Sequence, residues 1–212
     1  MKFFDKVFQV KDDSYYGVSG LNPELNCLYI YNSFLKYGRG MLVVTNSLYE
    51  ANLLYSKLIN YTDNVLFFPM DDFITSEAIA ISPEFKSERI HTINKLVQDN
   101  CYIVVTNLMG VLRYLPTKEV WKRHIIHLEK GTSIERDYLV HQLYNMGYER
   151  ESVVIETGKL GVRGYVLDVF PIGMENPVRI EFWGDEVDSI KTFDLESQLS
   201  KEEVSDIDIY PY

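Results

Sequence analysis

The sequence holds 212 residues, of which 46% are hydrophobic and 25% are charged, enough for one large domain or two small ones with apolar cores. No stretch approaches the roughly 18 consecutive apolar residues that a membrane span needs, so the composition excludes an integral membrane protein. The first residues, MKFFDKVFQV, include neither the apolar region nor the cleavage site of a secretion signal, so we expect a soluble, cytoplasmic protein with no membrane partner.

The net charge of −10 is confined to one part of the chain. Residues 1–132 hold 14 lysines and arginines and 14 aspartates and glutamates, whereas residues 133–212 hold 7 and 17 respectively. Unaided binding to a phosphate backbone needs a basic face, so the acidic segment argues against direct binding to DNA. The abrupt change also indicates two domains, for which we expect the bounds 1–125 and 126–212.

The first domain is expected to be an α/β domain. Its three expected strands are short, continuous apolar runs of the kind found in buried parallel strands, and each follows a segment with helical spacing. Asn46 or Ser47 is placed to cap one helix, and Ser82-Pro83 supplies the N-cap and first-turn proline of another. The expected strands are Met41–Thr45, Val65–Pro69 and Cys101–Thr106, and the helices begin near residues 23, 47 and 83. This alternation favours a parallel sheet with right-handed crossovers.

The second domain is expected to be a small α+β domain. Thr132-x-x-Glu135 resembles a capping box, and Leu139, Leu143 and Met146 follow it at helical spacing. The later apolar residues mostly alternate with period two, which predicts a helix packed on a mostly antiparallel sheet. The alternating runs are Val153-x-Ile155, Tyr165-x-Leu167-x-Val169, Val178-x-Ile180-x-Phe182 and Val187-x-x-Ile190, with turns at Gly158, Gly173 and Gly184.

A glycine-bearing stretch lies before the first expected helix, where a nucleotide-binding fold carries its P-loop. A working P-loop ends in Gly-Lys-Ser/Thr, because the lysine reaches the β- and γ-phosphates and the hydroxyl binds magnesium. Here Gly17, Ser19 and Gly20 are followed by Leu21-Asn22-Pro23, with no lysine before Lys36. We therefore interpret the stretch as a degenerate, non-functional P-loop that serves as a structural turn.

Other polar residues give no support for catalysis or metal binding. Asp71-Asp72 follows an expected strand, but without the P-loop lysine we interpret it as a loop or helix cap. His124 and His127 would point to opposite faces of an expected strand over residues 124–128, which does not suit a shared metal. Cys27 and Cys101 lack CxxC spacing and are expected to be buried free thiols. We expect no catalytic residues, cofactor or metal.

The carboxy-terminal half carries a long, ordered motif. It runs through Val162-Arg163-Gly164-Tyr165-Val166-Leu167-Asp168-Val169-Phe170-Pro171, then Arg179-Ile180-Glu181-Phe182-Trp183-Gly184-Asp185-Glu186, and ends at Phe193-Asp194-Leu195-Glu196-Ser197-Gln198. This resembles the signature shared by the excision-repair helicase UvrB and the bacterial transcription-repair coupling factors. The missing Gly-Lys-Thr loop, together with Phe68-Pro69-Met70-Asp71-Asp72 and Ser82-Pro83-Glu84, makes the chain more similar to the amino-terminal, UvrB-like region of the coupling factors.

The resemblance implies a function for each domain. Residues 1–125 would be a helicase-like domain of the P-loop type with a degenerate nucleotide site, and residues 126–212 would dock the damage-recognition protein UvrA. Neither would be catalytic, although whole coupling factors are ATP-dependent DNA translocases whose partners include RNA polymerase and DNA. The UvrA contacts that the resemblance implies are Arg150, Arg163, Gly164, Asp168, Phe170 and Arg179. Two alternatives stay open: a UvrB fragment that binds nucleotide or DNA, and an Arg163 and Asp168 that pair only within their own sheet.

Overall fold

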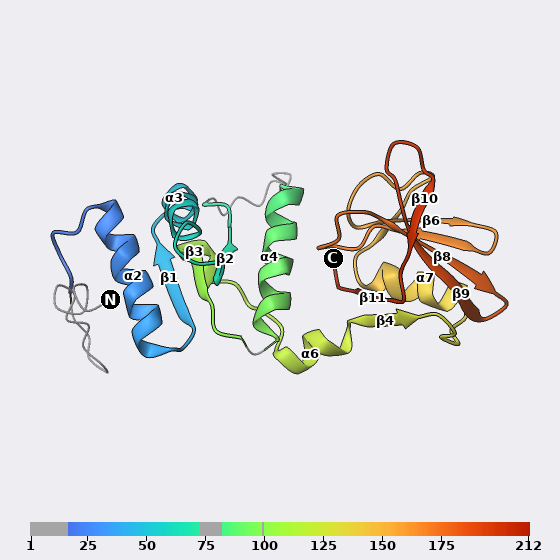
Figure 1. Cartoon of the computed structure of the whole chain (residues 1–212), viewed down its shortest axis with the longest axis horizontal. Coiled ribbons are helices and arrows are strands. Elements are labelled where there is room, and N and C mark those ends of the chain that lie inside the picture. The colour runs from blue at the N-terminus through green and yellow to red at the C-terminus, as the bar shows by residue number, and fades with distance from the viewer. Residues whose placement is uncertain (1–16, 73–81, 99) are drawn as a thin grey trace. The chain divides into compact units, whose positions relative to one another are not determined.

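The computed structural model describes residues 17–72, 82–98 and 100–212. The chain divides into two compact units, one that ends at Leu115 and one from Pro116 to Tyr212 (Figure 1). The division lies ten residues before the bound expected from the sequence, because the short helix α6 (Lys118–Arg123) belongs to the second unit. Within the described residues, no helix is both long and apolar enough to cross a membrane.

A three-stranded parallel sheet forms the centre of the first unit, with strand order β1-β3-β2. Helices α2 and α3 share an apolar core with the sheet that includes Cys27, Ala51 and Ile103, and α4 lies beside β2, where Thr92 donates to the carbonyl of Phe67 at 2.5 Å. The elements are α2 (Pro23–Tyr37), β1 (Met41–Thr45), α3 (Leu48–Leu58), β2 (Val65–Phe68), α4 (Pro83–Leu96), β3 (Ile103–Asn107) and α5 (Leu108–Val111). The expected parallel α/β arrangement is confirmed.

The strand β1 differs from the expectation in its burial. Its run MLVVT predicts a strand covered on both faces, but Leu42 and Val44 are exposed; β1 and β2 are the two edge strands of the sheet. By contrast, all four residues of β2 are buried. A continuous apolar run therefore identifies a strand here without indicating whether both of its faces are covered.

The second unit is built mainly from two sheets and the helix α7. A six-stranded sheet has the order β10-β9-β8-β7-β6-β5, and β4 pairs with β11 in a separate two-stranded ribbon. All pairings are antiparallel except that of β5 with β6, so the mostly antiparallel sheet is confirmed. The elements after α6 are β4 (Ile126–Glu129), α7 (Arg136–Asn145), β5 (Glu149–Arg150), β6 (Lys159–Arg163), β7 (Val166–Val169), β8 (Val178–Trp183), β9 (Glu186–Phe193), β10 (Ser200–Glu203) and β11 (Asp206–Ile209).

The main core of the second unit lies between one face of the large sheet, α7 and the β4–β11 ribbon. Leu139 and Leu143 of α7 pack there with Leu167, Ile180 and other inward residues of the strands. Val187 and Ile190 both join this core although three positions separate them. A bulge in the β8–β9 pairing, after Glu181, inserts one extra residue into β9 and restores the same face.

The expectations for residues 132–135 and 153–155 are wrong. Thr132 does not cap the helix: its hydroxyl accepts from the backbone N–H of Glu129, and α7 begins only at Arg136. Val153 and Ile155 do not lie on a strand, because residues 151–158 form a loop between β5 and β6. Within it the alternation is inverted, with Val154 buried and its two neighbours exposed.

Candidate docking surface

The hairpin of β6 and β7 carries the centre of the motif. Arg163 pairs with Val166, which leaves Gly164 and Tyr165 as a two-residue turn. Gly164 has φ of +57°, the conformation that the first turn position of a type II′ hairpin requires, so the glycine has a structural reason to be there. No heavy atom lies within 4 Å of the place where its Cβ would be, and Arg136 of α7 donates to its carbonyl. The hydrogen bond from Arg136 thus fixes the turn, while the space beside the Gly164 Cα is open.

The face of the large sheet opposite the main core presents two rows of side chains across the strands. One row consists of Arg163, Val166, Glu181 and Ser189, and the next of Gly161, Asp168, Arg179 and Lys191. In the first row Glu181 accepts from Ser189 at 2.6 Å and from Lys191 of the second row at 2.7 Å. The hydrogen bond from Lys191 is the largest cause of a lowered pKa of Glu181. This part of the face is polar and fixed by its own contacts.

Asp168 is buried, which corrects its expected exposure on the open face of the sheet. Only 2% of the residue is exposed, and Arg179 of β8 donates to it from Nε at 2.7 Å and from Nη2 at 3.0 Å. Arg179 also donates to the carbonyl of Gln198 and lies 4.8 Å from the ring centre of Phe193. Asp168 therefore pairs within its own sheet, as one of the two open alternatives expects.

Phe170 is buried as well, at 7% exposure, and this corrects its expected exposure on the same face. It packs with Val154 and Phe193 in a small apolar cluster separate from the main core. The loop of residues 151–158 thus covers part of a sheet face that the alternation predicts to be open. Gly161 allows this approach, because a Cβ there would lie 3.3 Å from both the carbonyl oxygen of Glu151 and Val154 Cγ2.

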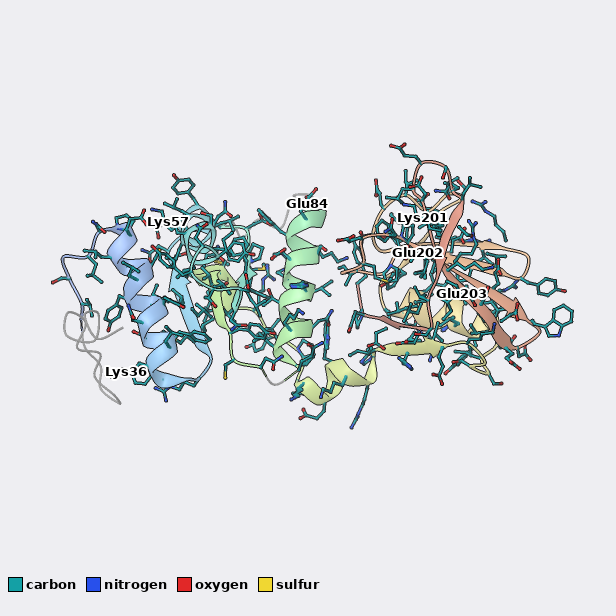
Figure 2. The ribbon with its side chains drawn as sticks, in the orientation of Figure 1. Lys36, Lys57, Glu84, Lys201, Glu202 and Glu203 are labelled. Carbon is teal, nitrogen blue, oxygen red and sulfur yellow. The ribbon has the colours of Figure 1, made fainter. Side chains whose placement is uncertain are left out.

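The end of the motif builds the turn that joins β9 to β10. Asp194 accepts from the backbone N–H and the hydroxyl of Ser197, each at 3.0 Å, and pairs with Lys201 at 2.9 Å. These donors, first the backbone N–H of Ser197, hold the pKa of Asp194 well below its usual range. Gln198, with φ of +59°, donates to the carbonyls of Leu195 and Val154 and so ties this turn to the loop of residues 151–158. The edge strand β10 follows, with Lys201, Glu202 and Glu203 exposed (Figure 2).

Three of the expected contacts are exposed: Arg150, Arg163 and Gly164. Arg163 donates from Nη2 to the carbonyl of Ser152 at 2.9 Å, and a guanidinium has five N–H donors, so capacity remains for a partner carboxylate. Sequence reasoning missed Trp183, which ends β8 with 84% of its surface exposed, next to the turn that holds Tyr165 at 72%. The sequence does contain a pattern that predicts the exposure of Trp183, because Arg179, Glu181 and Trp183 alternate with the core residues of β8.

The degenerate P-loop residues form no anion site of the usual kind. Gly17, Ser19 and Gly20 are exposed, and the N-terminus of α2 is capped instead by Asn22, whose Oδ1 accepts from the backbone N–H of Leu25 at 2.9 Å. A lysine does reach this helix end, but it comes from α3, where Figure 2 labels Lys57. Lys57 is paired with Glu24 in the first turn of α2. The carboxylate of Glu24 thus already neutralises the charge of Lys57.

The remaining polar candidates have structural roles. Asp72 accepts from the backbone N–H of Leu48 and so caps α3 together with Ser47, as the interpretation of Asp71-Asp72 as a loop or cap anticipated. His124 ends α6 rather than lying on a strand, whereas His127 lies on β4 and pairs with Asp208 at 2.8 Å. Cys27 is buried, but Cys101 is exposed, which corrects the second of the two expected burials. In the part of the chain that the structure describes, no group of three or more histidine, cysteine or acidic residues could hold a metal.

A known family model matches most of the second unit. The model of the "UvrB interaction domain" matches residues 126–212, which comprise the large sheet, α7 and the β4–β11 ribbon. A transcription-repair-coupling factor of Staphylococcus haemolyticus is 37% identical over 211 residues, or 97% of this chain. This chain is a relative of the transcription-repair-coupling factors.

Further coupling factors give the same result, and the resemblance seen in the sequence is confirmed. Those of Staphylococcus aureus and Staphylococcus epidermidis are 36% and 37% identical over 194 residues, which is 91% of the chain. The chain spans only 16–18% of the length of these relatives.

Folding accounts for much of the coupling-factor motif in this chain, since Asp168, Arg179 and Gln198 bind one another or the loop of residues 151–158.

Proposed function

We propose that this chain is the docking region of a coupling factor and recruits UvrA to RNA polymerase stalled at DNA damage. The observation that carries the proposal is the match of residues 126–212 to the UvrB interaction domain, together with an exposed Arg163 at the open turn of the β6–β7 hairpin. The first unit is proposed to be a helicase-like domain of the P-loop type that neither binds nor hydrolyses ATP. Catalysis, and contacts with RNA polymerase and DNA, would then belong to the rest of a longer protein.

The exposure of the side chains reduces the set of residues that we propose to contact UvrA, because Asp168 and Phe170 are buried. Arg163, Gly164 and Arg150 keep this role, and Trp183 joins them, because arginine and tryptophan are the residues most enriched among energetically dominant interface contacts. Arg179 has a supporting role, since it fixes Asp168 and the turn before β10 beneath the surface. A partner would meet an arginine, an open glycine turn and a rigid aromatic ring at one end of the sheet.

Capture of purified UvrA by the immobilised chain tests the proposal. Arg163→Glu should weaken capture by at least about 30-fold, as expected when a charge in a desolvated interface pair is lost. Its thermal midpoint should stay within a few degrees of wild type, because an exposed arginine contributes about 1 kcal/mol or less to folding. Arg123→Glu makes the same change of charge on exposed helix α6 and should capture UvrA like wild type. Wild-type capture by a folded Arg163→Glu protein would place the docking face elsewhere.

A second candidate function is the binding of nucleotide or DNA by the first unit, the activity expected of a UvrB fragment. The open depression at the start of α2, with a volume of about 270 Å³ and Lys57 in its wall, is the observation in its favour. Binding of magnesium-ATP at that depression, with loss of binding in Lys57→Ala, would support this candidate over the docking proposal.

A further inference from the structure

The loop of residues 151–158 lies where a partner of the sheet would otherwise touch the strands. Beneath it are the buried Phe170 and Phe193, which pack with the loop residue Val154. A protein that docks across this face and contacts Arg163 therefore meets the outer side of the loop next to it. Phe170, which the sequence predicts to be a contact, cannot reach such a partner because the loop covers it. Side chains of the loop must therefore supply the contacts in this part of the face.

Several bonds hold the loop on the sheet. The backbone N–H of Glu151 donates to the carbonyl of Leu160 at 2.8 Å, and Arg163 donates to the carbonyl of Ser152 at 2.9 Å. Further along, the side chain of Val154 is 1% exposed in the apolar cluster. These contacts fix the loop on the sheet, so a partner would need little free energy to order it.

The outer side of the loop is apolar at its centre. Val153 is 43% exposed and Ile155 is 58% exposed, on either side of the buried Val154. Both side chains are branched at Cβ and have few rotamers, so they lose little freedom when a partner covers them. Exposed charged residues border them, namely Arg150, Glu151, Glu156 and Arg163. An apolar centre with a charged rim is the usual composition of a protein interface.

We propose that Val153 and Ile155 form the apolar part of the UvrA docking surface, continuous with Arg163 through its bond to Ser152. This inference rests on the proposed function, because the partner that covers the loop is the one that engages Arg163. The complementary surface on UvrA is an apolar depression beside a carboxylate, the carboxylate for Arg163 and the depression for the two branched side chains. The hydrogen bond from Arg163 to the loop would keep the two parts of the surface in register.

Titration of the 212-residue chain with purified UvrA tests the inference. The double variant Val153→Ser/Ile155→Ser should bind at least about tenfold more weakly, with an unchanged thermal midpoint because both side chains are already exposed. Val44→Ser is the matched control: it replaces a valine of similar exposure, 46%, in the first unit, and should bind UvrA like wild type. Val154→Ser marks the opposite behaviour, since it removes a buried side chain and should lower the thermal midpoint.

The outcomes separate this inference from the proposed function. If wild type does not bind UvrA, the proposed function itself fails and this inference fails with it. If wild type binds, Arg163→Glu is defective and the folded double variant binds within twofold of wild type, the docking proposal stands and the apolar contact is overturned. A tenfold loss in the double variant, with Val44→Ser unaffected, supports the contact.

Discussion

Asp168 and Arg179 face each other across β7 and β8, and two hydrogen bonds of 2.7 and 3.0 Å join the carboxylate to the guanidinium. Because the carboxylate is buried and the guanidinium largely so, loss of the negative charge leaves Arg179 without its counterion. Asp168→Asn should therefore lower the free energy of unfolding by about 2–3 kcal/mol, measured by urea denaturation.

Asp188→Asn is the control for this change, since Asp188 is exposed on β9 and surface substitutions usually shift stability by no more than about 0.5 kcal/mol. Stability of Asp168→Asn equal to that of Asp188→Asn would show that the pair contributes little. UvrA capture by folded Asp168→Asn should match wild type, which separates a structural role from a docking role.

Magnesium-ATP should not bind this chain. The helix that would receive the phosphates is capped by Asn22, and Lys57 beside it is already paired with Glu24. A lysine that replaces the missing P-loop residue would be needed to hold the β- and γ-phosphates. Calorimetric titration up to roughly millimolar magnesium-ATP should show no saturable heat, given that functional P-loops use that lysine. Saturable, magnesium-dependent binding would contradict the structural interpretation of Gly17, Ser19 and Gly20.

Undamaged duplex DNA should bind weakly, with a dissociation constant above about 10 μM at physiological salt. The reason is the net charge of −10, which lies within residues 133–212 and repels a phosphate backbone. Fluorescence anisotropy with a labelled duplex measures this affinity. Tight binding that weakens steeply with salt would contradict this prediction and would show that the chain has a basic face despite its net negative charge.

His127 and Asp208 form an exposed pair across β4 and β11. The hydrogen bond with Asp208 raises the pKa of His127, and the charges of Asp206 and Glu129 act in the same direction. With a folded-state pKa above the unfolded value of about 6.5, the pair's contribution to stability is complete below that pH. It is lost as the pH rises through the folded-state pKa. An NMR titration should find the pKa of His127 above about 6.5 in wild type and lower in Asp208→Asn; an unchanged pKa in that variant would contradict the pairing.

The extent to which the sequence predicts this structure differs between elements. Apolar runs locate β1, β2 and β3 because a buried parallel strand needs such a run, but the same kind of run occurs in β1, where Leu42 and Val44 are exposed. Alternation correctly assigns Leu167 and Val169 to the core. It cannot show that a loop from another part of the chain covers the opposite face and buries Phe170, because that contact is long-range.

The candidate site shows the same limit. The motif locates the hairpin with Arg163 and Gly164, whose turn follows from local backbone chemistry. It does not distinguish Asp168, whose partner lies on the next strand, from a residue that serves docking. A motif shared within a family reflects both folding and binding, and only burial and hydrogen bonds separate the two. Trp183 shows the reverse case, a docking candidate that sequence reasoning passed over although it lies inside the motif.

Gly161 provides a final test, because it sets the distance between β6 and the loop of residues 151–158. A Cβ at this position would lie 3.3 Å from the carbonyl oxygen of Glu151 and from Val154 Cγ2, so the larger side chain of Gly161→Val must displace the loop. We expect a loss of about 1–3 kcal/mol, typical of an overpacked site. We also expect faster tryptic cleavage after Arg150, which is exposed and adjoins the loop. Gly40→Val is the control, since the nearest atom to its Cβ is 3.6 Å away in the first unit. Unchanged cleavage after Arg150 in Gly161→Val would mean that the loop is not held against β6 as the structure shows.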